Sequence, residues 1–349
     1  MAFNFKLLKE ISEVPGTSGY ESEVRKLIIK RVKPYVDEIK IDGIGNVIAI
    51  KKGKSRKKLM IPAHMDEIGF MVRHIDDRGF IKVQTIGGFD PKTLTAQRVI
   101  IHGKKPIVGV FGGKPIHLMT PEERGKKLKI SDFHIETGYS GKELKKLVAV
   151  GDPITRKQEL IEMGDCVNGK SMDNRVSVFV LIEALKKLKT KPACDVYGVF
   201  TVQEEVGLRG AHVAGHHLNP EFCICLDTTI AYEGPSASPD ENITKLGEGT
   251  AIKIMDSSAI VDYRMLDFIK KTANKTKIKW QSEIMTRGGT DTGGVQRMAM
   301  DGAICGAISI PTRNIHQSVE MCNKDDITAS INLLAACCKD ITNYDWKHK

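Results

Sequence analysis

The sequence predicts an α/β fold that is interrupted by an inserted β-rich domain. The 349 residues are enough for two domains or for one large α/β domain. Helical and strand-like segments alternate in residues 1–69 and 163–349, whereas residues 70–162 hold mainly short β-type runs broken by glycine and proline. Because the alternating pattern resumes after the β-type runs, we expect residues 70–162 to form a separate domain inserted into the first.

The first segment begins with two predicted helices between residues 4 and 35, separated by a break at PGTSGYE. Ser18 and Glu21 form an S-x-x-E capping pattern in this break, which predicts that the second helix starts near Gly19. The alternating stretch EIKIDGIGNVIAIKKG and the apolar run KLMIPAHMD then predict strands. The last of these strands is expected to be buried and to carry His64 and Asp66 at its C-terminal end.

The segments that follow differ in their periodicity. The insertion contains the short β-type runs FMVRHI, GFIKVQTIGG, RVIIHG and KPIVGVFG. After it we expect a helix at RVSVFVLIEALKKLK, a strand at DVYGVFTVQEE, a helix at GAHVAGHHL and a strand at FCICLD. Further on come the run IKWQSEI, the glycine-rich stretch RGGTDTGG, a helical VQRMAMDG, the apolar run AICGAISI and a helix from about Asp325 to Tyr344.

Composition narrows the class of protein. The net charge of +10 could suit nucleic acid, but the basic clusters lack interleaved aromatics and KKGKSRKK falls at a turn between strands, which favours a solvated surface. The eight cysteines include several in apolar strand-like runs and form no CxxC pair, so we expect reduced thiols in the core. Neither a signal peptide nor a long apolar run is evident, which predicts a cytoplasmic protein with no membrane association.

Candidate functional residues gather at the ends of predicted strands, where sites of open α/β sheets form. These endings are AHMDE (His64, Asp66), KSMDN (Asp173), VQEEVG (Glu204, Glu205), CLDTT (Asp227) and NIHQS (His316). Taken singly, His64 could be a hydrogen-bonded or surface histidine, Asp173 an N-cap of the helix that follows it, and Asp227 a cap or turn residue. The adjacent Glu204 and Glu205 are harder to explain in that way, because neighbouring carboxylates repel unless a cation or a proton separates their roles.

The carboxylates and imidazoles at these strand ends could together bind metal ions. Imidazole and carboxylate ligands suit zinc, cobalt or manganese, and two ions would need a shared carboxylate. A water between ions roughly 3.5 to 4 Å apart becomes hydroxide near neutral pH and serves as the nucleophile. One further carboxylate must then act as general base, and on residue types alone Glu204 and Glu205 divide the tasks of ligand and base in either order.

The motifs AHMDEIGFMV, SMDNR, QEEVGLRGA, LDTT, GGTDTGG and PTRNIHQSVEM together resemble the M42 family of metallo-aminopeptidases over essentially the whole chain. The resemblance implies a mixed-sheet zinc-peptidase catalytic domain with helices on both faces, formed by residues 1–69 and 163–349. It also implies that residues 70–162 are a small β-barrel-like oligomerisation domain. Family members assemble as tetrahedral dodecamers that admit short peptides, so a homo-oligomer of this kind is expected.

The same resemblance assigns roles to the site residues. It implies that His64 and Asp227 bind one divalent ion, that Glu205 and His316 bind the other, and that Asp173 bridges them. Glu204 is then the catalytic base. Asp66 is expected to accept a hydrogen bond from the His64 ring and so orient it. The peptide bond from Asp173 to Asn174 is expected to be cis.

Some assignments rest on weaker signals or stay open. Asp291, in RGGTDTGG, is interpreted as a contact for the free amino group of the peptide, and His117 as a residue that could reach a neighbouring subunit's site. Alternative functions are another metallohydrolase on the same scaffold, either a deacylase or a carboxypeptidase, or a non-enzymatic scaffold or nucleic-acid-binding protein. The preferred N-terminal residue of the substrate and the metal used are not predicted.

Overall fold

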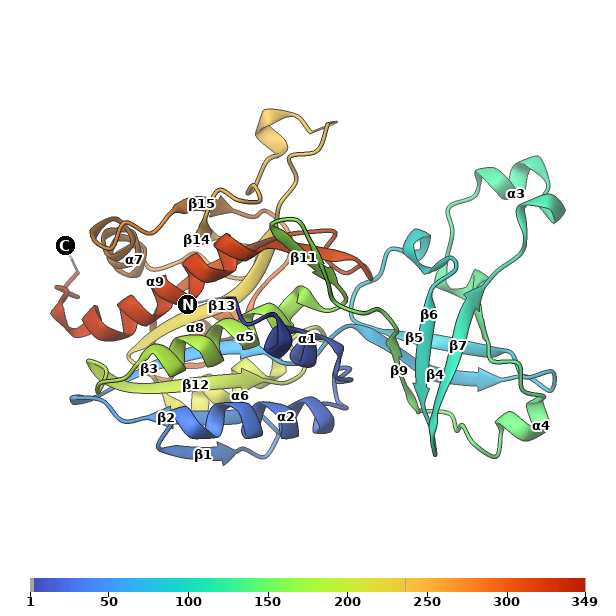
Figure 1. The fold of residues 1–349 in the computed structure, drawn as a ribbon, viewed down its shortest axis with the longest axis horizontal. Coiled ribbons are helices and arrows are strands. Elements are labelled where there is room, and N and C mark those ends of the chain that lie inside the picture. Colours follow the sequence, from blue (N-terminus) through green and yellow to red (C-terminus); the bar gives the residue numbers. More distant parts are fainter. Residues whose placement is uncertain (1–2, 236, 349) are drawn as a thin grey trace.

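The computed structural model describes residues 3–235 and 237–348 and contains two parts, a sheet covered by helices and a smaller barrel beside it (Figure 1). This arrangement confirms the predicted fold class of a mixed α/β sheet with an inserted barrel-like unit. Both ends of the described chain lie on the sheet part, away from the barrel (Figure 1).

A mixed sheet of eleven strands forms the large part. Its main path runs, in spatial order, through β1 (Glu38–Ile41), β2 (Val47–Lys51), β12 (Cys194–Thr201), β3 (Ser55–His64), β13 (Phe222–Ile230), β16 (Ile304–Arg313), β17 (Glu320–Asn323), β11 (Cys166–Gly169) and β10 (Ile161–Met163). A branch of two strands, β14 (Thr250–Met255) and β15 (Trp280–Ile284), pairs with β16 through β14. The central strands β12, β3, β13 and β16 are parallel, so their carboxyl ends share one edge of the sheet.

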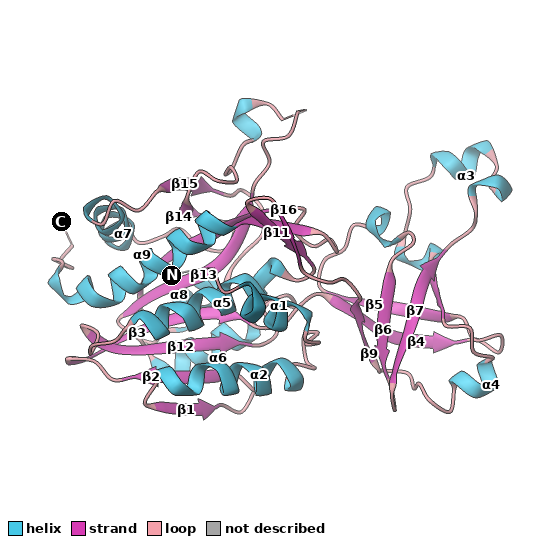
Figure 2. Cartoon of the chain, in the orientation of Figure 1, coloured by secondary structure: helices cyan, strands magenta, loops and turns pink. Residues whose placement is uncertain are grey.

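Helices cover both faces of this sheet (Figure 2). One face packs against α1 (Phe5–Glu13), α2 (Ser22–Val32), α5 (Met172–Lys187), α7 (Tyr263–Lys275) and α9 (Lys324–Asp340). The opposite face packs against α6 (Arg209–Leu218) and α8 (Asp291–Met298). Successive strand residues alternate between the two cores, as Leu59 and Ile61 on one side and Met60 on the other illustrate.

The barrel is a closed ring of six antiparallel strands. Its strands, in ring order, are β4 (Gly69–Ile75), β5 (Ile81–Ile86), β8 (His134–Glu136), β7 (Pro106–Gly112), β6 (Arg98–His102) and β9 (Pro153–Arg156). Two short helices, α3 (Pro121–Gly125) and α4 (Gly141–Leu144), lie in its connections. The interior is filled by alternate strand residues such as Phe70, Val99, Phe111, Ile135 and Ile154. Short 3-10 turns lie in the barrel connections at Pro91–Leu94, Ile116–Leu118 and Ile130–Asp132, and in the sheet part at Lys33–Tyr35, Pro239–Glu241 and Ile341–Asn343.

The start of the second helix differs from the expectation. The helix α2 begins at Ser22 rather than near Gly19, and the predicted capping box at Ser18 and Glu21 is wrong. The Ser18 hydroxyl donates to the Asp66 carboxylate at 2.6 Å, and no side-chain hydrogen bond caps the start of α2 at its N-cap residue Glu21. Glu21 instead accepts a hydrogen bond from the backbone N–H of Gly19. A local pattern was overridden here by a contact with a residue far along the chain.

Three other observations bear on the composition. All eight cysteines are free and seven of them are buried, which confirms the expected reduced core thiols. The basic run KKGKSRKK lies where β2 turns into β3, as predicted. Among the described residues, the helices are too short or too polar to cross a lipid bilayer.

Candidate metal centre

A cavity that contains several carboxylates and two imidazoles lies at the carboxyl edge of the four parallel strands. His64 is the last residue of β3, Glu204 and Glu205 follow β12, and Asp227 lies within β13. Two further elements complete the lining, because Asp173 lies in the first turn of α5 and His316 follows β16. These six side chains line one cavity of about 580 Å³.

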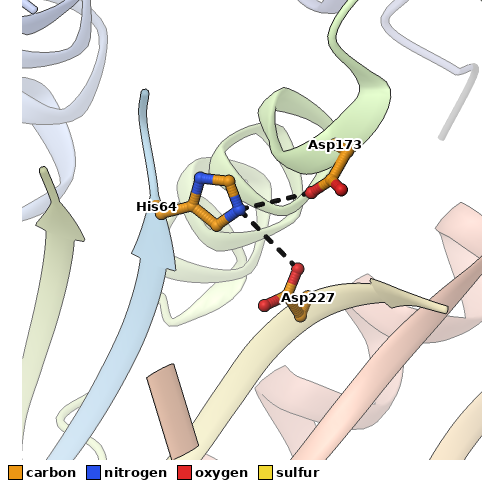
Figure 3. Close-up of side chains that lie close together, drawn as sticks. All are labelled: His64, Asp173 and Asp227. Atoms are coloured by element: carbon orange, nitrogen blue, oxygen red, sulfur yellow. Dashed lines mark hydrogen bonds and ion pairs between the residues drawn. The ribbon is translucent and has the colours of Figure 1, made fainter. Parts of the chain in front are cut away.

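The side chains form two groups that share Asp173. In the first, His64 Nε2 lies 3.2 Å from Asp173 Oδ1 and 3.8 Å from Asp227 Oδ1 (Figure 3). In the second, His316 Nε2 lies 3.3 Å from Asp173 Oδ2 and 3.3 Å from Glu205 Oε2. Within each group the ligand atoms all lie within 4.8 Å of one another. Asp173 therefore directs one carboxylate oxygen toward each group.

The electrostatics of this cavity favour bound cations. Burial raises the pKa values of the Glu204 and Asp227 carboxyls well above their ordinary range, and it also raises the pKa of Glu205. Several carboxylates in one buried place repel one another unless positive charge neutralises them. The Glu205 Oε1 atom is buried and lacks a hydrogen-bond partner among the described residues. An orphaned carboxylate oxygen beside imidazoles fits a divalent metal ligand, so the residues present suit such ions.

The two histidines carry positive charge when no metal competes for their nitrogens. Burial alone would lower the pKa of His316, but the carboxylates of Glu205 and Asp173 outweigh it and raise that pKa to about 11. His64 behaves likewise, with burial opposed by Glu204 and Asp173 and a pKa well above its usual value. The same contacts hold the pKa of Asp173 below its ordinary value, although burial by itself would raise it. The centre thus stabilises positive charge strongly.

Asp66 contacts the His64 ring and the backbone of Glu204 and Glu205. His64 Nδ1 lies 3.2 Å from the backbone carbonyl oxygen of Asp66 and 3.4 Å from its carboxylate oxygen Oδ1. The Asp66 carboxylate also accepts hydrogen bonds from the backbone N–H groups of Glu204 at 3.1 Å and Glu205 at 3.3 Å. One buried carboxylate thereby contacts both the His64 ring and the backbone of the two glutamates, a larger set of contacts than the sequence suggested.

Glu204 stands apart from the two ligand groups. Its carboxylate lines the cavity, and its Oε2 atom lies 3.8 Å from His64 Nε2. The structure brings its neighbour Glu205, rather than Glu204, into a group with Asp173 and His316. The side chain of Glu204 is therefore near the ligand atoms without belonging to either set.

Asp291 and His117 occupy different positions from those of the main set. Asp291 is the first residue of α8 and is buried, and its carboxylate accepts a hydrogen bond from the Thr201 hydroxyl. The described lining residues of the cavity include its neighbours Gly289 and Thr290 but not Asp291 itself. His117 lies in the 3-10 turn Ile116–Leu118 of the barrel, between two exposed apolar residues.

The backbone around Asp173 is held by contacts with neighbouring segments of the sheet part. The peptide bond between Asp173 and Asn174 is cis, as the resemblance implied. The Asn174 side chain donates to the backbone carbonyl of Leu226 at 3.0 Å, next to Asp227. Glu320, which the sequence did not indicate as a site residue, is buried and accepts hydrogen bonds from the backbone N–H groups of Asp173 and His316. An acid within the motif PTRNIHQSVEM was visible, but nothing in the local pattern indicated its partners.

The fold and the site together define an α/β protein with a buried carboxylate–histidine centre suited to divalent cations. Residues 45–333 match the M42 glutamyl aminopeptidase family. The chain belongs to the M42 family and is an aminopeptidase, a hydrolase of peptide bonds.

Relatives of known name extend over nearly the whole chain. The lysyl aminopeptidase of Pyrococcus furiosus is 34% identical, and the alignment covers 98% of this chain and 99% of that protein. The glutamyl aminopeptidase of Lactococcus lactis is 33% identical over 95% of each chain. Among solved structures, the TET1 peptidase of Pyrococcus horikoshii superimposes with a TM-score of 0.86 at 32% identity, covering 96% of this chain and 98% of that one.

Proposed function

We propose that this chain is a two-metal aminopeptidase that removes N-terminal residues from short peptides. The single observation that carries the proposal is the position of Asp173, whose two carboxylate oxygens face two separate groups of ligand atoms. A carboxylate shared in this way is the bridge that a pair of divalent ions requires. Membership of the M42 family supplies the peptide-bond chemistry.

The ligands divide between the two ions along the lines of the two groups. His64 and Asp227 would hold one ion and Glu205 and His316 the other, with Asp173 common to both. Zinc, cobalt or manganese all accept this donor set of imidazole nitrogens and carboxylate oxygens. When bound, such ions polarise the scissile carbonyl and lower the pKa of water.

Glu204 is proposed as the general base. It faces the cavity close to the ligands without joining either group, so its carboxylate is free to exchange protons. It would accept a proton from the attacking water and return it to the departing amine, a task that typically contributes about 10²- to 10⁴-fold in rate. Asp66 would hold both the His64 ring and the backbone at Glu204 in place.

The cavity also supports a proposal for substrate preference. Among its described lining residues, Arg287 is the one charged side chain outside the ligand groups and Glu204. It is exposed, and the other residues that line the cavity include Thr228, Ile230 and Met285. A guanidinium pairs well with carboxylates, so we propose that the chain prefers an acidic N-terminal residue. This agrees with the name of the L. lactis relative rather than that of the P. furiosus one.

The loop that carries Arg287 is anchored on both sides. The backbone N–H of Met285 donates to the Met255 carbonyl at 3.0 Å. The Gly288 carbonyl accepts from the Ser257 backbone N–H at 3.0 Å and from the Ser257 hydroxyl at 2.6 Å. Fixed ends reduce the conformational freedom that a substrate would otherwise have to restrict, which favours a specific role for the side chain.

The barrel is proposed as the oligomerisation domain of a homo-oligomer, with a tetrahedral dodecamer as the expected form. The solved TET1 peptidase assembles into a tetrahedron or a large octahedral shell. In this chain the barrel exposes Val108, Val110, Ile116 and Leu118, apolar side chains that an interface would bury. An enclosed assembly would restrict access to short peptides. Light scattering of the purified chain tests this, because a monomer at micromolar concentration would contradict it.

The proposed activity is tested by comparing three kinds of substrate with the same purified protein. Aminoacyl anilides should be hydrolysed, whereas N-acetylated aminoacyl anilides and peptides blocked at the N-terminus should not. Hydrolysis of N-acetylated substrates would favour a deacylase, and release of C-terminal residues from blocked peptides would favour a carboxypeptidase. A chelator should abolish turnover, and added zinc, cobalt or manganese should restore it.

A further inference from the structure

The second ligand group depends on a short loop between two strands. His316 lies between β16, which ends at Arg313, and β17, which starts at Glu320. Asn314 and His316 both adopt left-handed backbone conformations, with φ of 57° and 65°. Residues other than glycine disfavour this region, so contacts from outside the loop must hold it in place.

Glu320 provides the first of these contacts. Its Oε1 atom accepts a hydrogen bond from the His316 backbone N–H at 2.9 Å, and its Oε2 atom accepts one from the Asp173 backbone N–H at 2.9 Å. Both oxygens are thus used, one for each ligand segment. Because a carboxylate is rigid and planar, it fixes the separation between the backbone of Asp173 and that of His316.

The barrel provides the remaining contacts. Arg156, the last residue of β9, is 1% exposed, and its Nη2 atom lies 3.8 Å from Glu320 Oε1. The Ser318 hydroxyl donates to the Gln97 side-chain oxygen at 2.7 Å. Gly88 follows the barrel strand β5, and a Cβ atom at this position would lie 3.5 Å from Nδ1 of the His316 ring. His316, Ser318 and Glu320 are therefore all adjacent to residues of the inserted segment.

Among the described residues, the Glu320 carboxylate is the one anionic group that forms an ion pair with Arg156. The nitrogens of its buried guanidinium form no hydrogen bond with the described residues. The guanidinium lies near the carboxylate of Glu320 and the ring of Phe89, whose centroid is 6.0 Å from the guanidinium carbon. A buried cation is costly unless an anion compensates it. The Glu320 carboxylate lies where it can compensate the Arg156 charge. This contact connects a buried cation of the barrel with the residue that bonds the backbone of both Asp173 and His316.

We infer that Glu320 and Arg156 are positioning residues through which the barrel holds the His316 half of the metal centre in its binding geometry. This inference rests on the proposed two-metal function. The His64 half has its own support, because Asp66 contacts the His64 ring and the backbone of Glu204. Loss of the Arg156 contact should therefore weaken binding of the ion on the His316 side and leave binding of the ion on the His64 side unaffected.

The test is calorimetric titration of the full-length, metal-free protein with Co²⁺. Wild type should bind two ions. In Arg156→Met, the affinity for the ion on the His316 side should fall about 10- to 100-fold, the range typical of residues that orient ligands. Glu320→Gln also alters the contact with the backbone of the shared ligand Asp173, so it should weaken binding of that ion most and binding of the other ion to a smaller extent. The amide of glutamine offers a single acceptor oxygen, so one of the two backbone N–H groups loses its partner. Arg156→Lys, which retains the charge, should recover much of the affinity.

A matched control and a second mutant background distinguish a specific effect on the His316 side of the centre from a general loss of structure. Arg73 lies on the barrel strand β4 and is exposed, so Arg73→Met should bind both ions as wild type does. In the His316→Ala background, which is expected to retain a single ion, adding Arg156→Met should change the remaining affinity less than about 2-fold. Equal weakening of both ions, or loss of the remaining ion in that background, would overturn the inference.

A milder variant covers the case in which Arg156→Met does not fold. Ser318→Ala removes only the hydroxyl that bonds Gln97, and it should lower the affinity of the same ion about 3- to 10-fold, less than the roughly 10- to 100-fold typical of residues that orient ligands, because it removes a single hydrogen bond between the loop and the barrel. Two wild-type affinities in Ser318→Ala, Glu320→Gln and any folded Arg156 variant would contradict the inference alone. Failure of the wild-type protein to bind two ions would instead contradict the proposed function.

Discussion

The carboxylate of Asp66 accepts a hydrogen bond from the backbone N–H of Glu204 at 3.1 Å, while its Oδ1 atom lies 3.4 Å from His64 Nδ1. A single buried acid therefore connects a candidate metal ligand with the candidate base. The Ser18 hydroxyl donates to the other oxygen of Asp66 at 2.6 Å and fixes its orientation. The Asp66 carboxylate also accepts a hydrogen bond from the backbone N–H of Glu205 at 3.3 Å, so it holds the backbone of both glutamates.

Replacing Asp66 by Asn should reduce both metal affinity and turnover by about 10- to 100-fold. An amide offers one acceptor oxygen, so it cannot serve the His64 ring, the Ser18 hydroxyl and the two backbone N–H groups together. Isothermal titration with Co²⁺ and steady-state kinetics measure the two effects. Unchanged metal affinity together with unchanged turnover would show that Asp66 has no supporting role.

Replacing Glu204 by Gln should leave two ions bound and lower turnover about 10²- to 10⁴-fold, because the ligands remain while proton transfer is lost. Glu205→Gln is the matched control, since its carboxylate belongs to the group with Asp173 and His316. That variant should lose one ion. Metal analysis by mass spectrometry and anilide hydrolysis distinguish the cases, and metal loss in Glu204→Gln with full occupancy in Glu205→Gln would reverse the two roles.

Metal affinity should rise with pH. The pKa of His316 is raised to about 11 in the metal-free site, with burial outweighed by Glu205 and Asp173, so this imidazole is protonated at neutral pH. A metal ion must displace that proton, and a higher pH weakens the competition. Titrations in buffers of different ionisation enthalpy should reveal net proton release on binding. Proton uptake, or affinity that falls between pH 6 and pH 8, would contradict this charge assignment.

Arg287→Ala should lower kcat/KM for glutamyl and aspartyl anilides about 10- to 100-fold and leave leucyl anilide nearly unchanged, since a charge-assisted hydrogen bond contributes roughly 1.5–3 kcal/mol. Arg287→Glu should shift the preference toward lysyl anilide. Dipeptides and their C-terminal amides serve as a further control, because a guanidinium could also bind a free C-terminal carboxylate. A wild-type preference for neutral or basic residues would contradict the proposed role of Arg287.

The sequence indicated much of the centre because its residues follow apolar runs that form parallel strands. His64, Glu204 and Glu205 each come at the end of such a run, and parallel strands bring those ends to one edge. The order of the central strands and the closure of the barrel are long-range pairings, which local periodicity does not encode. The family resemblance, rather than the pattern, supplied the barrel and the division of the two glutamates.

The supporting residues could not be predicted for a related reason. Ser18 sits in a local capping pattern, yet its hydroxyl bonds Asp66. Arg156 and Glu320 come from the barrel and from the sheet, and their proximity depends on how these two parts pack. Asp291 was interpreted as part of a loop, whereas α8 begins at that residue and buries it. In each case a contact between distant segments determined the role of the side chain.

The bridge formed by Asp173 is the central claim, and metal content measured together with activity tests it most directly. Metal-free protein titrated with Zn²⁺ or Co²⁺ should reach two ions per chain, with full turnover only when both are bound. Asp173→Asn should disturb both ions, because its oxygens face both ligand groups at 3.2 and 3.3 Å. Full activity with one ion, or two ions bound with wild-type affinity in Asp173→Asn, would contradict the account.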